Sequence, residues 1–241
     1  VKYVTRRLDP NDPTLRARFA YGSYDQMDAV LAGSVPLSDT FRIGGAVAGL
    51  TRGGFGDNLT TGAENYNKDV FAARVSAEWA PTPDFLVRLS GDHYQDDSSQ
   101  RQGYRLLPGA VQLQPLPDRF DTTANFGPIT KSSAEGTGAQ LFVDWSPGGG
   151  DLTLRSITAV REDEYESPID FDSTAARTFD VPVVYENEQF SQELQLIYEG
   201  ERLSVVAGAY YLDANAFDAF DAIFTSIAQF TLGDVDTKTW A

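Results

Sequence analysis

The chain has 241 residues, with 35 Asp and Glu against 19 Lys and Arg, which gives a formal net charge of −16. This acidic balance argues against nucleic-acid binding, because the phosphate backbone needs a basic surface. The chain has no cysteine, which excludes disulfide frameworks, thiolate zinc sites and cysteine nucleophiles. No stretch approaches the ~18 consecutive apolar residues of a membrane-spanning helix.

Alternation of apolar and polar residues with a period of two dominates the chain and predicts β-strands, whereas helical periodicity is scarce. Near the N-terminus, apolar residues at odd positions from 15 to 21 alternate with Arg16 and Arg18. Odd positions from 27 to 35 and from 41 to 49 continue the pattern, and the clearest alternation runs over 71–79. Further strands are predicted over 85–89, 139–145, 152–159, 190–198 and 203–211, and the start of another over 236–241.

The lengths of the predicted connections alternate along the chain. Tight turns are expected at 36–39, 80–84, 146–151 and 199–202. Long loops are expected near 53–67, 95–135, 162–187 and 213–236. Outer-membrane barrels keep this rhythm, with strands of ~10 residues that alternate between an apolar outer face and a polar inner face. The predicted fold is therefore all-β: an antiparallel up-and-down transmembrane β-barrel.

Membrane physics also predicts where the charged and aromatic side chains lie. A lipid-facing arginine would cost ~2–4 kcal/mol near the bilayer midplane, so mid-strand arginines opposite the apolar runs are expected to face the lumen. These residues are Arg16, Arg18, Arg42, Arg74, Arg88 and Arg155. Aromatic residues beside the tight turns are expected to form a girdle at the membrane interface. They are Trp79, Phe85, Trp145 and Tyr198.

Several segments resemble the TonB-dependent outer-membrane receptors. VKYVTRRLDP at 1–10 resembles the family's plug-to-barrel junction, and AYGSYDQMDAVLAGSVPLSDTFRIGGA at 20–46 resembles its first barrel hairpins. QFSQELQL at 189–196 and VVAGAYYL at 205–212 resemble a recurring mid-barrel pair, and DTKTWA at 236–241 resembles the start of the next strand. The order and spacing of these motifs extend over nearly all of the chain.

The resemblance implies a partial barrel. Family members usually carry a TonB box, a globular plug and a 22-stranded barrel that ends in an aromatic residue. Here residues 1–10 resemble the end of the plug and its junction, and residues 11–241 resemble about nine or ten strands of the barrel. The chain is thus expected to be the N-terminal half of the barrel, without the plug and the C-terminal strands. Its two sheet edges would need partners in lipid.

The sequence offers little for catalysis, and no enzyme is expected. A Ser-His-Asp site would have to use the single His93, and no G-x-S-x-G nucleophile elbow is present. One histidine also argues against a dedicated zinc site, so no cofactor is expected. Loop calcium is left open, because two acidic runs could supply oxygen ligands, although neither has EF-hand spacing. The runs are Asp92, Asp96 and Asp97, and Asp213, Asp218 and Asp221.

Ligand capture is expected on the inner wall, near the end of the sheet that carries the long loops. Aromatic stacking together with a guanidinium would suit a siderophore, an oligosaccharide or another bulky nutrient. The candidate ligand-binding residues are Tyr66, His93, Tyr94, Tyr104, Arg105 and Phe120. The alternative interpretation is a surface loop whose aromatic side chains pack on one another.

Three functions are under consideration. The resemblance implies a receptor in the outer membrane of a Gram-negative bacterium that imports a scarce nutrient, such as a ferric siderophore, haem, cobalamin or a glycan. Its partners would be outer-membrane lipid, the nutrient, and a TonB-type energy-transducing complex that acts through the missing plug. The alternatives are a small self-contained porin-like or structural outer-membrane barrel, and a soluble β-rich binding module.

Overall fold

The computed structural model describes residues 7–100, 103–108, 116–125, 131–224 and 227–240. Regular structure in these ranges is almost entirely β, and the exception is a short 3₁₀ turn at Pro147–Gly149. None of the helical structure in the described ranges could cross a membrane.

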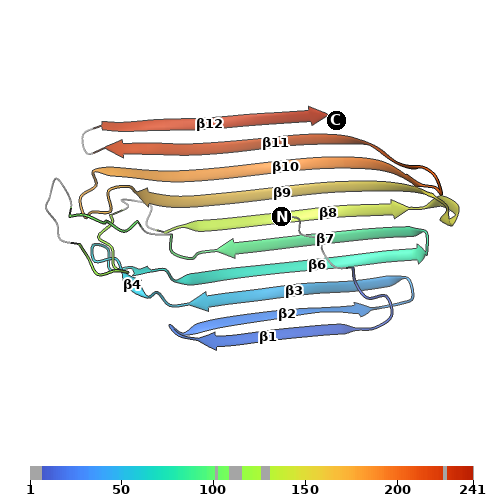
Figure 1. The fold of residues 1–241 in the computed structure, drawn as a ribbon, viewed down its shortest axis with the longest axis horizontal. Helices are drawn as coiled ribbons and strands as arrows, with labels where there is room; N and C mark the ends of the chain where they lie inside the picture. Colours follow the sequence, from blue (N-terminus) through green and yellow to red (C-terminus); the bar gives the residue numbers. More distant parts are fainter. Residues whose placement is uncertain (1–6, 101–102, 109–115, 126–130, 225–226, 241) are drawn as a thin grey trace.

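Ten strands form one antiparallel sheet in which every strand pairs with its neighbours in chain order (Figure 1). Their bounds are β1 (Thr14–Gly22), β2 (Gln26–Pro36), β3 (Phe41–Arg52), β6 (Lys68–Thr82), β7 (Phe85–Asp96), β8 (Ser133–Trp145), β9 (Leu152–Asp170), β10 (Phe179–Glu199), β11 (Ser204–Phe224) and β12 (Ile227–Trp240). β4 (Gly56–Asp57) and β5 (Glu64–Asn65) form a separate pair inside the β3–β6 connection. The predicted all-β, antiparallel, up-and-down arrangement is therefore confirmed.

Short turns and long connections gather at opposite ends of the sheet, as Figure 1 shows. The turns that join β2 to β3, β6 to β7, β8 to β9 and β10 to β11 lie at one end, which we call the turn end. The β3–β6 and β7–β8 connections lie at the opposite end, which we call the loop end. This division places the irregular segments of distant strands close together at the loop end.

The strands from β9 to β12 extend farther than the apolar alternation predicts. β9 continues to Asp170 and β10 begins at Phe179, so only the segment between them is a loop within the range 162–187. β11 and β12 likewise occupy nearly all of the range 213–236. The prediction of long loops there is wrong, because backbone hydrogen bonds continue the pairing beyond the segments of regular apolar alternation.

The sheet is a single layer, so it encloses no large apolar core. Leu86, Ala124, Val181 and Val183 are the buried apolar residues among those described. Many large apolar side chains instead lie exposed on one face, where Val75 is 63% exposed. Directly opposed residues of an antiparallel pair share a face, so the register joins these side chains into a continuous surface, the apolar face. It includes Leu15, Leu31, Val47, Phe71, Val75, Leu89, Leu141, Val160 and Leu194.

The four aromatic residues predicted to form a girdle lie at the turn end of the apolar face. Phe85 is opposite Trp145 in the β7–β8 register, and its ring packs edge-on against Trp79 with the centroids 6.0 Å apart. Tyr198 lies beside the β10–β11 turn. These positions suit an aromatic girdle, and its location at a membrane interface stays a prediction.

The opposite side of the sheet, the polar face, carries charged side chains in pairs. All six arginines predicted to face a lumen lie on it: Arg16, Arg18, Arg42, Arg74, Arg88 and Arg155. Glu78 is only 1% exposed and lies between two of them, 2.9 Å from Arg42 Nε and 2.7 Å from Arg88 Nε. Arg155 Nη2 pairs with Asp144 Oδ2 at 2.9 Å. Whether this face lines a lumen stays a prediction.

Residues 7–9 pass over the polar face beside this network. The backbone N–H of Leu8 donates to Glu78 Oε1 at 3.4 Å. Gly44 makes room for this segment, because a Cβ on Gly44 would lie 2.6 Å from Leu8 Cδ2. Residues 1–6, which carry most of the predicted plug-to-barrel junction, lie outside the described residues.

The apolar face predicts an asymmetric response to added charge. Val75→Arg in the full-length protein should lower the free energy of unfolding by ~2–4 kcal/mol, because the guanidinium would be forced among acyl chains. The measurement is the denaturant midpoint of the protein folded into lipid vesicles. Ala72→Arg is the matched control, since it adds the same charge to the other face of the same strand. Equal losses in both variants would contradict a lipid-facing apolar face.

The buried network predicts a large effect of a small change at Glu78. Glu78→Gln should destabilise the protein by about 3 kcal/mol, because it leaves the guanidinium groups of Arg42 and Arg88 without their shared counter-charge. Denaturant midpoints again measure the change. Glu186→Gln, at an exposed glutamate of β10, should alter stability by no more than ~0.5 kcal/mol. A Glu78→Gln variant as stable as this control would refute the structural role of the network.

Candidate functional site

A cavity of about 1000 Å³ lies at the loop end of the sheet. Its wall includes Arg52 at the end of β3, Tyr66 from the β3–β6 connection, and Tyr104 and Arg105 from the β7–β8 connection. Asp170, at the end of β9, completes the opposite side. Residues far apart in the chain meet here because the meander returns every second connection to the same end.

Phe55 is the centre of an aromatic cluster on the cavity wall. Its ring stacks on Tyr66 with the centroids 4.8 Å apart and an interplanar angle of 9°, and it meets Phe120 edge-on at 5.3 Å. The guanidinium of Arg52 lies 5.1 Å from the centroid of the Phe55 ring, within cation–π range. The cluster therefore presents flat rings and a positive charge side by side.

Tyr66 is held in an unusual backbone conformation. Its φ is 63°, in the left-handed region that non-glycine residues rarely adopt. Arg52 Nη2 donates to its carbonyl oxygen at 2.5 Å, which helps to hold this geometry. Burial raises the pKa of the Tyr66 phenol, so the hydroxyl is neutral at physiological pH and can donate a hydrogen bond.

Two buried asparagines fix the loops that form the cavity. Asn58 Nδ2 donates to the carbonyl oxygen of Ala124 at 3.0 Å, and Asn65 Nδ2 donates to Thr122 Oγ1 at 3.1 Å. Both asparagines are 1% exposed. Backbone hydrogen bonds join the same two segments, including one from the N–H of Leu59 to the carbonyl of Thr122 at 2.8 Å. The β3–β6 and β7–β8 connections are thus tied to each other rather than folded separately.

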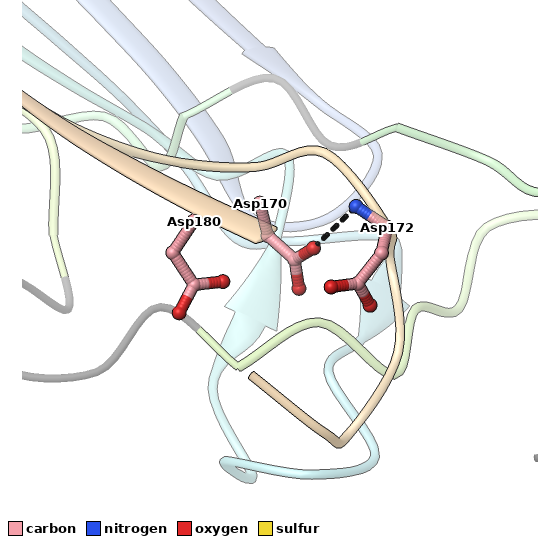
Figure 2. A group of neighbouring side chains, drawn as sticks. All are labelled: Asp170, Asp172 and Asp180. Carbon is pink, nitrogen blue, oxygen red and sulfur yellow. Dashed lines mark hydrogen bonds between the residues drawn. The ribbon is translucent and has the colours of Figure 1, made fainter. Parts of the chain in front are cut away.

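Three aspartates meet at the base of the β9–β10 loop, on the edge of the cavity. Asp170 and Asp180 are direct cross-strand partners at the ends of β9 and β10, and Asp172 lies in the loop between them. Each of the three offers a carboxylate oxygen, and these atoms lie within 4.8 Å of one another (Figure 2). We call this group the aspartate trio.

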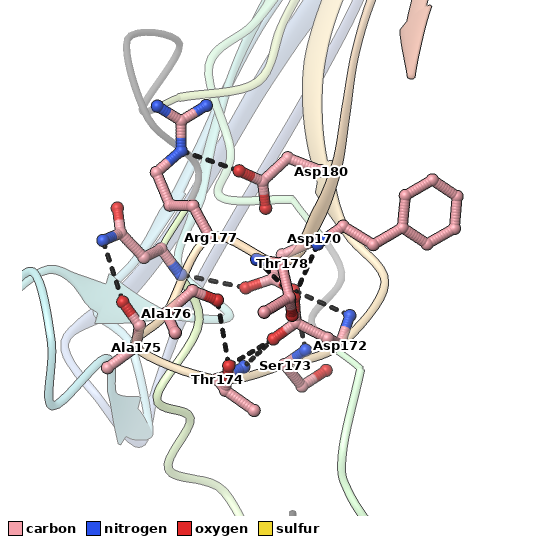
Figure 3. Close-up of polar contacts among 11 residues, drawn as sticks. Asp170, Asp172, Ser173, Thr174, Ala175, Ala176, Arg177, Thr178 and Asp180 are labelled. Atoms are coloured by element: carbon pink, nitrogen blue, oxygen red, sulfur yellow. Dashed lines mark hydrogen bonds and ion pairs between the residues drawn. The ribbon is translucent and has the colours of Figure 1, made fainter. Parts of the chain in front are cut away.

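The loop wraps around two of these carboxylates with hydrogen-bond donors (Figure 3). Asp170 Oδ1 accepts from the backbone N–H groups of Asp172 at 2.9 Å and Ser173 at 2.7 Å. Asp172 accepts from the hydroxyl and backbone N–H groups of Thr174 and Thr178. Asp180 differs, because the group that contacts it is a guanidinium: Arg177 Nε lies 2.7 Å from its Oδ2.

Burial and like charges perturb the ionisation of the trio. Burial raises the pKa of Asp170 to about 6, and the charges of Asp172 and Asp180 add to the rise. Burial also raises the pKa of Asp180, although Arg177 opposes the rise. For Asp172, burial is outweighed by the hydrogen bonds from Thr174 and Thr178, so its pKa is lowered. The structure thus holds carboxylates of different acidity in one small space.

The structure brings four of the six predicted ligand-binding residues together. Tyr66, Tyr104 and Arg105 line the cavity, and Phe120 packs on Phe55. The other two lie along β7. Tyr94 is on the polar face, where its hydroxyl is 3.5 Å from Asp163 Oδ1. His93 is on the apolar face, with Nδ1 3.0 Å from Thr137 Oγ1, and so lies apart from the group.

The acidic runs singled out for calcium do not gather in the structure. Asp92 pairs with Arg161 at 3.1 Å, and Asp213 lies 3.4 Å from Lys238 Nζ. Among the described residues, the carboxylates that gather are the aspartate trio. The trio is not evident from the sequence, because Asp170 and Asp180 become neighbours only through the hairpin register.

No protein-family profile and no curated protein sequence matches the chain. Solved structures do match. The ferric yersiniabactin uptake receptor FyuA from Yersinia pestis is 15% identical, with a TM-score of 0.75 over 98% of this chain and 36% of the receptor. The siderophore receptor PiuA from Acinetobacter baumannii is 12% identical, with a TM-score of 0.69 over 95% of this chain and 34% of the receptor.

FpvA from P. aeruginosa, solved with bound pyoverdines, is 16% identical, with a TM-score of 0.60 over 93% of this chain and 29% of the receptor. The same receptor matches equally in a complex with pyocin S2. The chain spans about a third of the length of these receptors. The neighbours are transport receptors and not enzymes. At these identities the likeness shows the fold alone: the strands of this chain are arranged like a segment of these receptor structures, which is the fold that the sequence resemblance predicts.

Proposed function

We propose that the chain is part of an outer-membrane receptor that takes up ferric siderophores with energy relayed by a TonB-type complex. The observation that carries this proposal is that the sheet exposes apolar side chains on one face and buries charged side chains on the other. Val75 and its apolar neighbours are exposed on one face, whereas Glu78, Arg42 and Arg88 form a nearly buried network on the other. This arrangement suits a wall between acyl chains and an aqueous interior.

A soluble binding module is disfavoured by the same observation. A water-soluble β-sheet domain buries its apolar face against a second layer. In the described ranges the sheet has one layer, and its apolar face has no protein covering. Exposed apolar surface on this scale is characteristic of a membrane or partner interface.

A small self-contained barrel is disfavoured by the edges of the sheet. Closure would require β1 to pair with β12, but the order of the sheet begins at β1 and ends at β12, at opposite sides of Figure 1. In lipid, each of these strands needs a further partner to satisfy its backbone groups. Additional strands of a larger barrel would supply those partners.

The substrate class rests on the chemistry of the cavity and on the neighbours. Ferric siderophore complexes are bulky, and many combine aromatic chelating groups with negative charge. The cluster of Phe55, Tyr66 and Arg52 offers stacking surfaces and a guanidinium to such a ligand. Of the solved structures of similar fold, one is named a siderophore receptor and another a ferric yersiniabactin uptake receptor. Haem, cobalamin and glycans are the competing substrates of the same site.

A cavity variant tests this proposal. In the full-length receptor, Tyr66→Ala should weaken binding of the cognate ferric siderophore about tenfold, because a ring contact worth ~1.4 kcal/mol is lost. Equilibrium binding and uptake of radiolabelled iron, measured with a panel of siderophores, haem and cobalamin, identify the ligand and report the loss.

Phe71→Ala is the matched control, since it removes an aromatic ring of the apolar face outside the cavity. It should leave ligand affinity unchanged. Saturable uptake of haem, cobalamin or a glycan in place of iron chelates would overturn the siderophore assignment. Passive, unsaturable diffusion of small solutes would support the porin-like alternative instead.

A further inference from the structure

The base of the β9–β10 loop brings three carboxylates close together. Asp170 and Asp180 face each other directly across the strand pair, where like charges are destabilising. Asp172 brings a third carboxylate oxygen to within 4.8 Å of theirs. One cation, Arg177, pairs with Asp180. With all groups ionised, three carboxylates and one guanidinium leave a formal charge of −2.

A second observation points to a missing partner. Asp180 is 1% exposed, and its Oδ1 atom has no hydrogen-bond partner among the described residues, whereas its Oδ2 atom accepts from Arg177. A buried carboxylate oxygen without a donor is unfavourable. Figure 2 shows the Asp180 carboxylate beside that of Asp170, with Asp172 on the far side. The unsatisfied oxygen thus belongs to the same group of acids.

We propose that the aspartate trio binds a hard divalent cation, Ca²⁺. Carboxylate oxygens are the ligands that Ca²⁺ prefers, at 2.3–2.6 Å, so two oxygens on opposite sides of the ion lie up to ~5 Å apart. The spread of the trio, within 4.8 Å, matches this span. Mg²⁺ would require tighter octahedral geometry at 2.0–2.1 Å. Oδ1 of Asp180, which lacks a hydrogen-bond partner among the described residues, would coordinate the ion, and water would complete the coordination.

The proposed ion would join several segments at the mouth of the cavity. Asp170 ends β9, Asp172 lies in the loop, and Asp180 is the second residue of β10. Asp170 Oδ2 also accepts from the backbone N–H of Asn125 at 2.9 Å, which connects the β7–β8 connection to the same point. Asp170 and Asp172 line the cavity wall. Bound Ca²⁺ would therefore order one side of the cavity before any nutrient arrives.

Protons should compete with the ion. Metal ligands must be deprotonated, so binding is measured at neutral pH or above. The expected dissociation constant at neutral pH is roughly 0.1–1 mM, as in other extracellular calcium modules.

Calorimetric titration of the full-length protein in detergent tests the site. The protein is stripped with a chelator, dialysed at pH 7.5 and titrated with CaCl₂. Asp180→Asn should bind one fewer Ca²⁺ than the wild type, or bind it at least tenfold more weakly. Glu188→Gln removes one charge from an exposed position of the same strand and should bind as the wild type does. Equal binding by wild type and Asp180→Asn overturns the proposal.

Thermal unfolding and hydrogen exchange give a second readout. At ten times the dissociation constant, Ca²⁺ should raise the apparent folding equilibrium constant of the wild type about tenfold. Without Ca²⁺, Asp180→Asn should be at least as stable as the wild type, because it relieves repulsion, and Ca²⁺ should not stabilise it further.

In the wild type, Ca²⁺ should slow amide exchange in the segment 168–181, which needs no variant to observe. If amide exchange in this segment is unchanged at saturating Ca²⁺, the proposal is wrong. Asp180 is then satisfied by a proton shared with a neighbouring carboxylate and not by a metal ion. Because these measurements use no nutrient ligand, their outcome is independent of the proposed transport function.

Discussion

Backbone hydrogen bonding between neighbouring strands is the constraint on which this structure depends. Within a bilayer, every N–H and C=O group of a strand must be paired with a neighbouring strand. The chain meets this constraint with a meander in which each interior strand has two partners. Once the register is set, each side chain is committed to one of two faces. The contrast between Val75 and Glu78, three residues apart on β6, follows directly from that commitment.

The polar face shows how charged side chains are accommodated on a single-layered sheet. Glu78 is shared by Arg42 and Arg88, and residues 7–9 cross the sheet over the same network. Arg7 approaches Asp144, which already pairs with Arg155. Arg42, Arg88 and Arg155 are thus each paired with an acidic side chain, so that residues 7–9 cross the sheet beside paired charges.

The sequence predicts the strands well only where one face is apolar. Residues 71–79 alternate clearly, and β6 forms there. Farther along, Glu162 and Glu164 face Glu188 and Glu186 across β9 and β10. In this region both faces of the strands are polar enough to contact water. The alternation of apolar and polar residues is therefore lost, although the strands remain paired. Hydropathy reports the surroundings of a strand, and backbone pairing decides whether the strand exists.

The candidate site was partly predictable for a similar reason. Tyr66, Tyr104 and Arg105 could be assigned to the loop end from connection lengths alone, and the cavity unites them. The position of Phe55 in the cavity wall is not evident from the sequence, because Phe55 lies in a glycine-rich segment that predicts only a flexible loop. The pairing of Asp170 with Asp180 depends on the exact register of the β9–β10 hairpin. Side-chain contacts of this kind can be identified only from the three-dimensional structure.

The gradient in strand length has a consequence for access. Strands grow from 9 residues in β1 to 21 in β10 and β11, and Figure 1 shows the loop-side ends of β10 to β12 lying farther out than those of β1 and β2. At about 3.3 Å per residue, the rim of such a wall is slanted. In the proposed receptor, the longer hairpins would block the approach of a large solute on one side. The solute would therefore enter from the side of the shorter strands and not along the barrel axis.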